Sequence, residues 1–295
     1  MIDIHHHLLY GVDDGAPGLA ASLALARTAA AEGVTHIVCT PHYSDLFPWQ
    51  QALIAERLAE LRAQLDGAVA LSLGCDFHLT AENIAEALAH PPRYSIANKG
   101  YLLVEFPRLI VPPQLDDALY RLQTAGYTIV VTHPERYPAI LSQPELLAGW
   151  LRRGCLVQLT AGSLCGRFGA AVEAFSQELL RRHWVHFVAS DAHHPRRRPP
   201  QMKEAHAYVA KRMGEETARR LFLTNPQAAL AGNRLPAQPQ PLGLDSYAPL
   251  NFDLSKFPLV KRAVAADSRL HADASRFHRL CNLLFSRRIV SRLNG

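Results

Sequence analysis

Short apolar runs alternate with amphipathic segments along most of the 295-residue chain. The runs are rich in valine, isoleucine and leucine, which is typical of strands buried on both faces of a parallel sheet. We predict strands within residues 1–7, 36–42, 69–77, 101–106, 128–134, 155–159 and 186–193. The segments between them show helical spacing and predict helices over residues 17–32, 50–65, 81–89, 113–124, 145–153, 168–182, 201–213 and 215–222.

Seven β–α units in succession predict an α/β fold whose parallel sheet closes into a distorted, TIM-like (β/α)7 barrel. An open, doubly wound sheet is the alternative. The placement of polar residues favours the barrel, because the active sites of barrels are built at the carboxyl ends of the strands. Histidine, aspartate or glutamate follows the apolar run in six of the seven predicted strands, as His5, His7, His42, Asp76, Glu105, His133, Asp191 and His193.

These strand ends predict a multinuclear metal centre. Side chains two apart on a strand project to the same side, so His5 and His7 point together, whereas His6 points away and is the weaker candidate. A ligand set of His, Asp and Glu without thiolate suits Mn, Fe or Zn better than Mg alone. Closely spaced ions would lower the pKa of a bound water and neutralise charge on a phosphoryl group.

Composition and charge narrow the class of protein. The hydrophobic share of 48% and the charged share of 19% are ordinary for a soluble globular protein. The net charge of +5 comes entirely from residues 236–295, which contain nine Lys or Arg against four Asp. The neutral remainder argues against a nucleic-acid partner. Five scattered cysteines, no secretory signal and no long apolar run indicate a reduced, cytoplasmic protein.

The charge excess also marks a boundary between a barrel, residues 1–235, and a tail, residues 236–295. The tail opens with a proline-rich segment that predicts a semi-rigid linker. Its later part alternates apolar residues with arginines, which is compatible with a solvated extension or with a helix that contacts a membrane surface or a protein. Cys281 and Arg287 have the spacing of cysteine-dependent phosphatases, but the residues between them lack the glycine-rich loop that this chemistry needs.

Several motifs of the chain occur in the same order in a known family. The chain resembles the polymerase-and-histidinol-phosphatase (PHP) family, and within it the bacterial manganese-dependent protein-tyrosine phosphatases of capsule and exopolysaccharide loci. The resemblance covers residues 2 to about 231. It rests on Ile2-Asp-Ile-His-x-His7, Val12-Asp-Asp-Gly15, Thr40-Pro-His42, Val104-Glu-Phe106, His133-Pro-Glu-Arg136, Ala161-Gly-Ser163, Ala189-Ser-Asp-Ala-His193, Arg198-Pro-Pro200 with Met202, and Asn225-Pro226.

The resemblance implies roles for particular residues. The eight strand-end residues become ligands of two or three divalent ions, with Mn²⁺ expected and Fe or Zn also compatible. Arg136 and Arg198 match the phosphate-binding arginines of the family, and Arg196 or Arg197 is an alternative for the second. His42, His193 and Asp14 are the candidates for a general acid. Asp14 is alternatively an orienting residue or a hydrogen-bond acceptor of its loop, or it serves only the turn Asp-Asp-Gly. The family has glutamate where this chain has Asp76, so one ion is expected to bind more weakly.

The resemblance also implies a substrate, a phosphotyrosine protein, and a partner, the tyrosine kinase that controls capsular or exopolysaccharide assembly. Two alternatives stay open at this point. One is a small-molecule phosphatase of the histidinol-phosphate type. The other is a regulatory protein with a degraded metal site.

Overall fold

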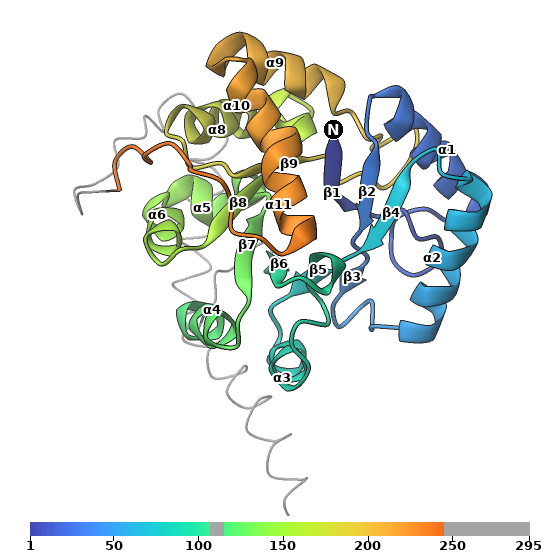
Figure 1. Ribbon diagram of the computed structural model, residues 1–295. Helices are drawn as coiled ribbons and strands as arrows, with labels where there is room; N and C mark the ends of the chain where they lie inside the picture. The colour runs from blue at the N-terminus through green and yellow to red at the C-terminus, as the bar shows by residue number, and fades with distance from the viewer. Residues whose placement is uncertain (107–114, 245–295) are drawn as a thin grey trace, which may run out of the picture. The chain divides into compact units, whose positions relative to one another are not determined.

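Strands and helices alternate through the chain, as Figure 1 shows for a computed structural model that describes residues 1–106 and 115–244. These residues belong to one compact unit, Met1–Asn251. The ordered strand pairs are all parallel and form two sheets, a 3-stranded sheet of order β1-β2-β4 and a 6-stranded sheet of order β3-β5-β6-β7-β8-β9. The strands are β1 (Ile2–His6), β2 (His36–Cys39), β3 (His42–Tyr43), β4 (Ala70–Leu73), β5 (Asp76–His78), β6 (Tyr101–Glu105), β7 (Thr128–Thr132), β8 (Leu156–Thr160) and β9 (Phe187–Ala189).

The two sheets together make the predicted distorted barrel. The strands predicted over residues 36–42 and 69–77 are each broken in two, which sequence reasoning missed. Pro41 lies at the first break and has no N–H to donate to a ladder. Gly74 lies at the second, where a Cβ would meet Val38 at 3.0 Å. The first halves, β2 and β4, stay with β1, and the second halves, β3 and β5, join the larger sheet.

The barrel closes between its first and last strands. The N–H of Asp191 donates to the carbonyl of His5 at 2.8 Å, and the N–H of His7 donates to the carbonyl of Ala192 at 2.9 Å. The amino ends of the strands are covered by α11 (Asn225–Ala231), because Ala229 shares a hydrophobic cluster with Ile2. The opposite rim, where the polar residues lie, therefore remains for the site.

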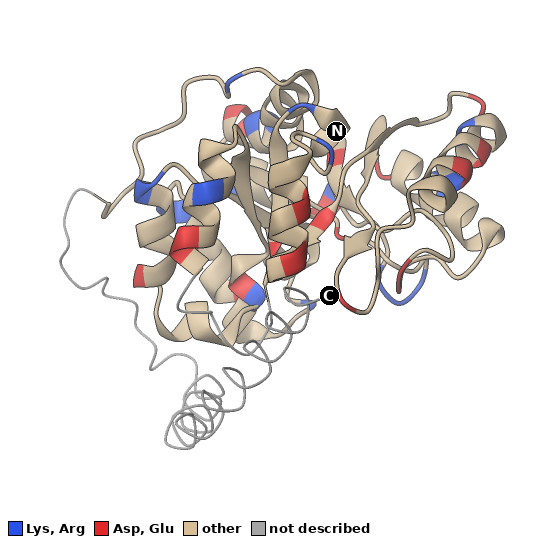
Figure 2. Ribbon diagram, turned by 90° about the horizontal axis from the view of Figure 1, so that it is seen from below, with Lys and Arg blue, Asp and Glu red and all other residues tan. Residues whose placement is uncertain are grey.

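The outer helices follow the prediction to within a few residues. They are α1 (Leu19–Ala31), α2 (Gln51–Leu65), α3 (Ala81–Ala89), α4 (Leu115–Thr124), α6 (Glu145–Arg152), α8 (Ala170–Arg181), α9 (Lys203–Met213) and α10 (Glu215–Arg219). The short elements η1 (Ile96–Asn98), η2 (Pro134–Arg136), α5 (Pro138–Ser142), α7 (Ala161–Leu164), η3 (Arg220–Thr224) and α11 were not predicted as separate helices. Figure 2 shows acidic and basic residues interspersed over these helices.

The predicted linker begins on the surface of the barrel. The indole N–H of Trp184 donates to the carbonyl of Leu242 at 3.0 Å, and Arg152 donates to the carbonyl of Leu244 at 3.0 Å. The boundary at residue 235 stays a prediction. The rest of the tail, with Cys281 and Arg287, lies outside the described residues. Within the described part of the chain, no helix is long and apolar enough to cross a membrane.

Candidate metal centre

All eight predicted ligands meet at one rim of the barrel. Together with Asp14 and His78, they supply donor atoms that fall into four groups. Within each group the donor atoms lie within 4.8 Å of one another. The groups are His5, His7 and Asp76; His5, His133 and Asp191; His42, Asp76, His78 and Glu105; and His7, Asp14, His42 and His193. Shared members join the groups into one continuous centre, and His78 belongs to it although sequence reasoning did not select it.

His5 on β1 and His7 just after it each have one ring nitrogen held by the protein and the other directed into the centre. Nδ1 of His5 lies 2.9 Å from Oε1 of Gln158, and Nδ1 of His7 lies 2.7 Å from Oδ2 of Asp13. Asp13 also accepts a hydrogen bond from the N–H of His42 at 3.0 Å. Nε2 of His5 and Nε2 of His7 are not used by these contacts and lie 3.3 Å apart. Both can therefore bind a cation. Asp13 and Gln158 are thus orienting residues that the sequence analysis missed.

Asp76 and Glu105 are two buried carboxylates of the centre. Asp76 is fully buried, and its Oδ2 lies 3.4 Å from Nε2 of His5 and 3.1 Å from Nδ1 of His42. Burial raises the pKa of Asp76, but the imidazoles of His5 and His42 outweigh burial and hold this pKa well below its ordinary value. Glu105 lies 3.5 Å from His42 and 3.6 Å from His133, so each carboxylate is shared between histidines of different strands.

His133 and Asp191 are held by left-handed backbone, with φ of 35° and 52°. Such conformations are costly for residues other than glycine and concentrate at functional sites. Burial lowers the pKa of His133 well below its ordinary value, so its imidazole is neutral and available as a ligand. Oδ1 of Asp191 lies 3.5 Å from His5 and 3.4 Å from His7, while Oδ2 pairs with the guanidinium groups of Arg136 and Arg198.

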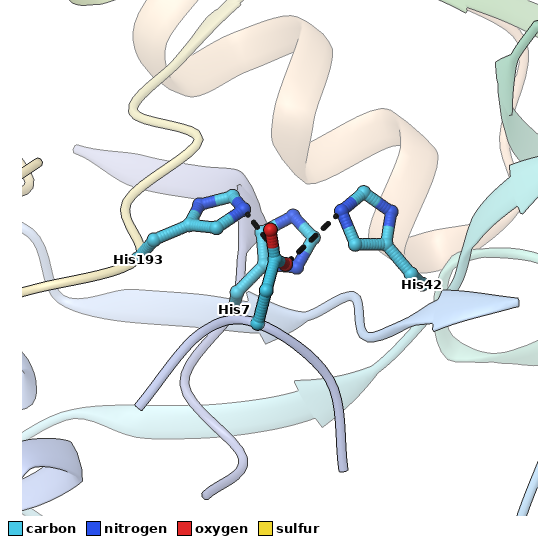
Figure 3. Close-up of side chains that lie close together, drawn as sticks. His7, His42 and His193 are labelled. Atoms are coloured by element: carbon cyan, nitrogen blue, oxygen red, sulfur yellow. Dashed lines mark ion pairs between the residues drawn. The ribbon is translucent and has the colours of Figure 1, made fainter. Parts of the chain in front are cut away.

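Asp14 lies at the open side of the centre, with 56% of its side chain exposed. Figure 3 shows His42 and His193 on either side of one carboxylate, whose Oδ1 is 3.4 Å from Nε2 of each ring. The hydrogen bonds from His193 and His42 lower the pKa of Asp14, so it is a carboxylate at neutral pH. It can therefore orient the two imidazoles or accept a proton, whereas a proton donor would need a raised pKa.

Arg136 and Arg198 both lie beside Asp191 and pair with its carboxylate. The guanidinium of Arg136 lies 4.6 Å from the ring centroid of Phe168, and that of Arg198 lies 6.0 Å from it. Arg198 is directed inward by a tight turn in which His194 and Arg198 pair through their backbones. Asp14, His193, Arg197 and Arg198 line a cleft of about 480 Å³ here. Arg196 is exposed, and Phe168, which holds both arginines from one side, was not foreseen as a site residue.

The donor set fits divalent cations. Buried polar side-chain atoms normally have hydrogen-bond partners. The buried donor atoms of this centre that have none among the described residues include Nδ1 of His42, both carboxylate oxygens of Asp76, Nε2 of His78 and Oε2 of Glu105. Nitrogen and carboxylate donors that converge without partners of their own are the atoms that a divalent ion would satisfy.

The chain is similar to proteins of known activity. The chain is 36% identical over 220 residues to the tyrosine-protein phosphatase YwqE of Bacillus subtilis, covering 73% of this chain and 86% of YwqE. It superposes with a TM-score of 0.75 and 35% identity on a crystal structure from work on YwqE of Bacillus subtilis and CpsB of Streptococcus pneumoniae, described as metal-dependent tyrosine phosphatases. The match covers 82% of this chain and 99% of that one.

A more distant likeness concerns the fold alone. The histidinol phosphate phosphatase of Lactococcus lactis has a TM-score of 0.50 with 13% identity, covering 75% of this chain and 95% of that one. The family model for capsular polysaccharide synthesis, CpsB/CapC, matches residues 1–231, the part of the chain that builds the barrel and the metal centre. This chain therefore belongs to the CpsB/CapC family of capsular polysaccharide synthesis.

Proposed function

We propose that the converging donors hold divalent ions at which the phosphate ester of phosphotyrosine is hydrolysed. The chain is a metal-dependent tyrosine-protein phosphatase of capsular polysaccharide synthesis, as its family membership establishes. The assignment of residues to this reaction is our proposal. The observation that carries it is the set of buried donors without partners, which lies beside Asp191 and the two guanidinium groups, Arg136 and Arg198, that pair with it.

The proposed ligands are His5, His7, His42, Asp76, Glu105, His133, Asp191 and His193. We propose two or three Mn²⁺ ions, because the set mixes imidazoles and carboxylates without thiolate; Fe or Zn would be accepted by the same donors. When bound, such ions supply a nucleophile at neutral pH and neutralise charge on the phosphoryl group. Gln158 fixes the tautomer of His5 and Asp13 fixes that of His7, so that Nε2 of each is the ligating atom.

The arginines are proposed to bind the substrate phosphate. Guanidinium groups grip phosphate oxygens in bidentate fashion and keep their charge in a buried setting. Arg136 and Arg198 reach the same carboxylate oxygen of Asp191 from two directions, so both point into the centre. Phe168 packs against them and limits the directions that their side chains can take. Oδ1 of Asp14 lies 3.4 Å from Nε2 of both His42 and His193, so its negative charge adds to that of the centre at these two rings.

The leaving group needs little help from the protein. The phenol of tyrosine has a pKa of about 10, so phenolate departs more readily than an alkoxide. This fits a site whose exposed carboxylate, Asp14, has a lowered pKa and is not a proton donor. A phosphotyrosine ring also extends its phosphate farther from the peptide backbone than phosphoserine does, which suits a centre recessed behind the opening of the cleft.

For the natural substrate we propose the tyrosine kinase that controls capsular or exopolysaccharide assembly. Cys39, Cys75, Cys155 and Cys165 are free thiols, which supports a reducing, cytoplasmic compartment. The basic tail, residues 236–295, is the part of the chain that we propose contacts a protein or a membrane surface. We propose no nucleic-acid partner, since basic residues in the barrel are balanced by acidic ones.

The test is hydrolysis of a phosphotyrosine peptide after chelation and dialysis. We expect loss of activity, recovery with Mn²⁺, and little turnover of histidinol phosphate under the same conditions. The Cys281→Ser variant should retain full activity. Full activity of the metal-free protein, or an inactive Cys281→Ser variant, would contradict the metal mechanism in favour of cysteine chemistry.

A further inference from the structure

Three neighbouring strands place four donor residues in two adjacent rows. His42 on β3 is the Cα partner of Asp76 on β5, and His78 on β5 is the Cα partner of Glu105 on β6. Asp76 and His78 are two residues apart, so their side chains project from the same side of β5. Residues in register on adjacent strands also project to the same side. The backbone thus directs all four side chains toward one point.

The donor atoms at that point are close together and have no other partners. Nδ1 of His42 lies 3.1 Å from Oδ2 of Asp76 and 3.5 Å from Oε2 of Glu105. Nε2 of His78 lies 2.6 Å from the same oxygen of Glu105, yet the two atoms are not aligned as a hydrogen bond. All four atoms are buried and without a hydrogen-bond partner among the described residues. The close approach of Nε2 of His78 to Oε2 of Glu105 without an aligned N–H is best explained by a cation that both atoms contact.

We propose that His78 is a metal ligand, so that one divalent ion is held by Nδ1 of His42, Asp76, Nε2 of His78 and Glu105. This inference rests on the proposed function and adds a residue to its metal centre. Two imidazole nitrogens and two carboxylates form a set that Mn, Fe and Zn all accept. His78 gives β5 a second donor beside the short side chain of Asp76, which offsets the weak binding expected from the sequence at this position.

The competing role for His78 is an outer one, in which its N–H merely orients Glu105. That role requires the N–H to point at the carboxylate, and the contact lacks this geometry. Glu105 also has other neighbours that can orient it, since His42 and His133 lie within 3.6 Å of its two carboxylate oxygens. The two roles make different predictions, because only a ligand places its nitrogen in direct contact with the ion.

The experiment compares His78→Ala with His90→Ala in the full-length protein. His90 is a matched control, since its Nε2 also faces a glutamate, Glu86 at 3.5 Å, but lies outside the four donor groups. Each protein is dialysed against a free Mn²⁺ concentration that just saturates the wild type, and bound metal is measured. We expect His78→Ala to retain one ion fewer per chain and His90→Ala to retain the full complement. Circular dichroism checks that each variant is folded.

A second measurement separates a ligand from an orienting residue. The ring of His78 is 26% exposed, so its removal leaves a space open to small molecules. We expect ¹⁵N-imidazole to restore the missing Mn²⁺ in His78→Ala, with ¹⁵N coupling to the ion in pulsed electron paramagnetic resonance. If His78→Ala misfolds, the same spectra are recorded for the wild type and for His78→Gln. We then expect one nitrogen fewer to couple to Mn²⁺ in the variant than in the wild type. Wild-type metal content and an unchanged nitrogen count would overturn the assignment of His78 alone, whereas a wild type that binds no Mn²⁺ would overturn the whole centre.

Discussion

At the scale of single residues, the centre depends on side chains that are not metal ligands themselves but hydrogen-bond to the ligands. A neutral imidazole has one donor and one acceptor nitrogen, so whatever binds its N–H selects which nitrogen is left as a ligand. Asp13 does this for His7 and at the same time holds the backbone of His42. Burial raises the pKa of Asp13, but His7 outweighs burial and keeps this pKa below its ordinary value, so Asp13 is an acceptor.

This arrangement predicts that Asp13→Asn weakens metal binding while the chain stays folded. An amide has one acceptor oxygen where the carboxylate has two, so the hydrogen bonds to His7, His42 and Gly15 cannot all be kept. We expect the metal concentration for half-maximal activity to rise by roughly 10–100-fold, which is typical for loss of an outer partner. Asp45→Asn, at an exposed aspartate, is the control. Equal Mn²⁺ requirements in the two variants would show that Asp13 does not select the tautomer.

The phosphate-binding arginines predict a different result, a loss of rate without loss of metal. Arg136→Ala and Arg198→Ala should each lower kcat/KM on an aryl phosphate by about 10²–10³-fold, the usual effect of removing one donor to the transition state. Metal content should stay at the wild-type value, because neither arginine is a ligand. Arg196→Ala is the matched control, since this arginine of the same turn is exposed. Near-normal kcat/KM in both test variants would refute the phosphate assignment.

His186 predicts how the free energy of unfolding changes with pH. Burial first, and then Arg220, lowers the pKa of His186 to about 4 from an ordinary value of 6.5. Between these two values the unfolded chain binds a proton that the folded chain does not, so the stability contributed by this site falls as pH falls from about 6.5 to about 4. The full loss is on the order of 3 kcal/mol, at about 1.4 kcal/mol per pKa unit.

The measurement is denaturant unfolding of the wild type and His186→Gln from pH 7 to pH 4 at a fixed metal concentration. Glutamine keeps an acceptor for the N–H of Val157, which Nδ1 of His186 binds at 3.1 Å. We expect a shallower dependence on pH in the variant, and the difference between the two proteins removes the contribution of all other titrating groups. Parallel curves would mean that His186 is protonated in the folded state as readily as in the unfolded state.

At the scale of elements, the loop after β1 is fixed by close packing. A Cβ on Gly15 would lie 2.4 Å from the carbonyl oxygen of His7 and 2.9 Å from Oδ1 of Asp13, so only glycine fits there. We expect Gly15→Ala to displace Asp13 and to raise the Mn²⁺ requirement at least as much as Asp13→Asn does. Gly18→Ala is the control, because a Cβ on Gly18 meets nothing within 4 Å. Matching activity and metal affinity in the two variants would contradict the role of this loop.

The elements also show which parts of the centre can be predicted from the sequence. Strand ends can be predicted, because an apolar run followed by His, Asp or Glu is a local pattern, and parallel strands bring their carboxyl ends to one rim. His78 has the same local signal as His5 and His7, a spacing of two from Asp76, and could have been selected. The breaks at Pro41 and Gly74 depend on which sheet each half joins, which is a non-local choice. Gln158 and Phe168 likewise carry no local pattern, since their partners lie far away in the chain.

At the scale of the whole molecule, the centre joins the two ends of the barrel. β1 and the segment after β9 are joined by an isolated bridge between His6 and Ala192, with hydrogen bonds from Asp191 to His5 and from His7 to Ala192. Asp191 also brings its side chain to within 3.5 Å of both His5 and His7. An ion held by these three residues would tie the first strand to the last at the point where the barrel closes.

Metal binding should therefore stabilise the fold as well as support activity. A ligand that binds only the folded state at 100 times its Kd adds about 2.7 kcal/mol, which raises Tm by on the order of 5–10 °C for a domain of this size. We expect Tm of the chelated protein to rise with Mn²⁺ concentration, and to rise less in Asp191→Asn, which keeps the shape of the side chain but weakens the tie. Asp66→Asn, at an exposed aspartate that follows α2, should respond like the wild type. If Tm of Asp191→Asn rose with Mn²⁺ as much as Tm of the wild type, Asp191 would not tie the first strand to the last through the ion, and the hydrogen bonds from Ser190 to the side chain of Asp3 would join the two strands without it.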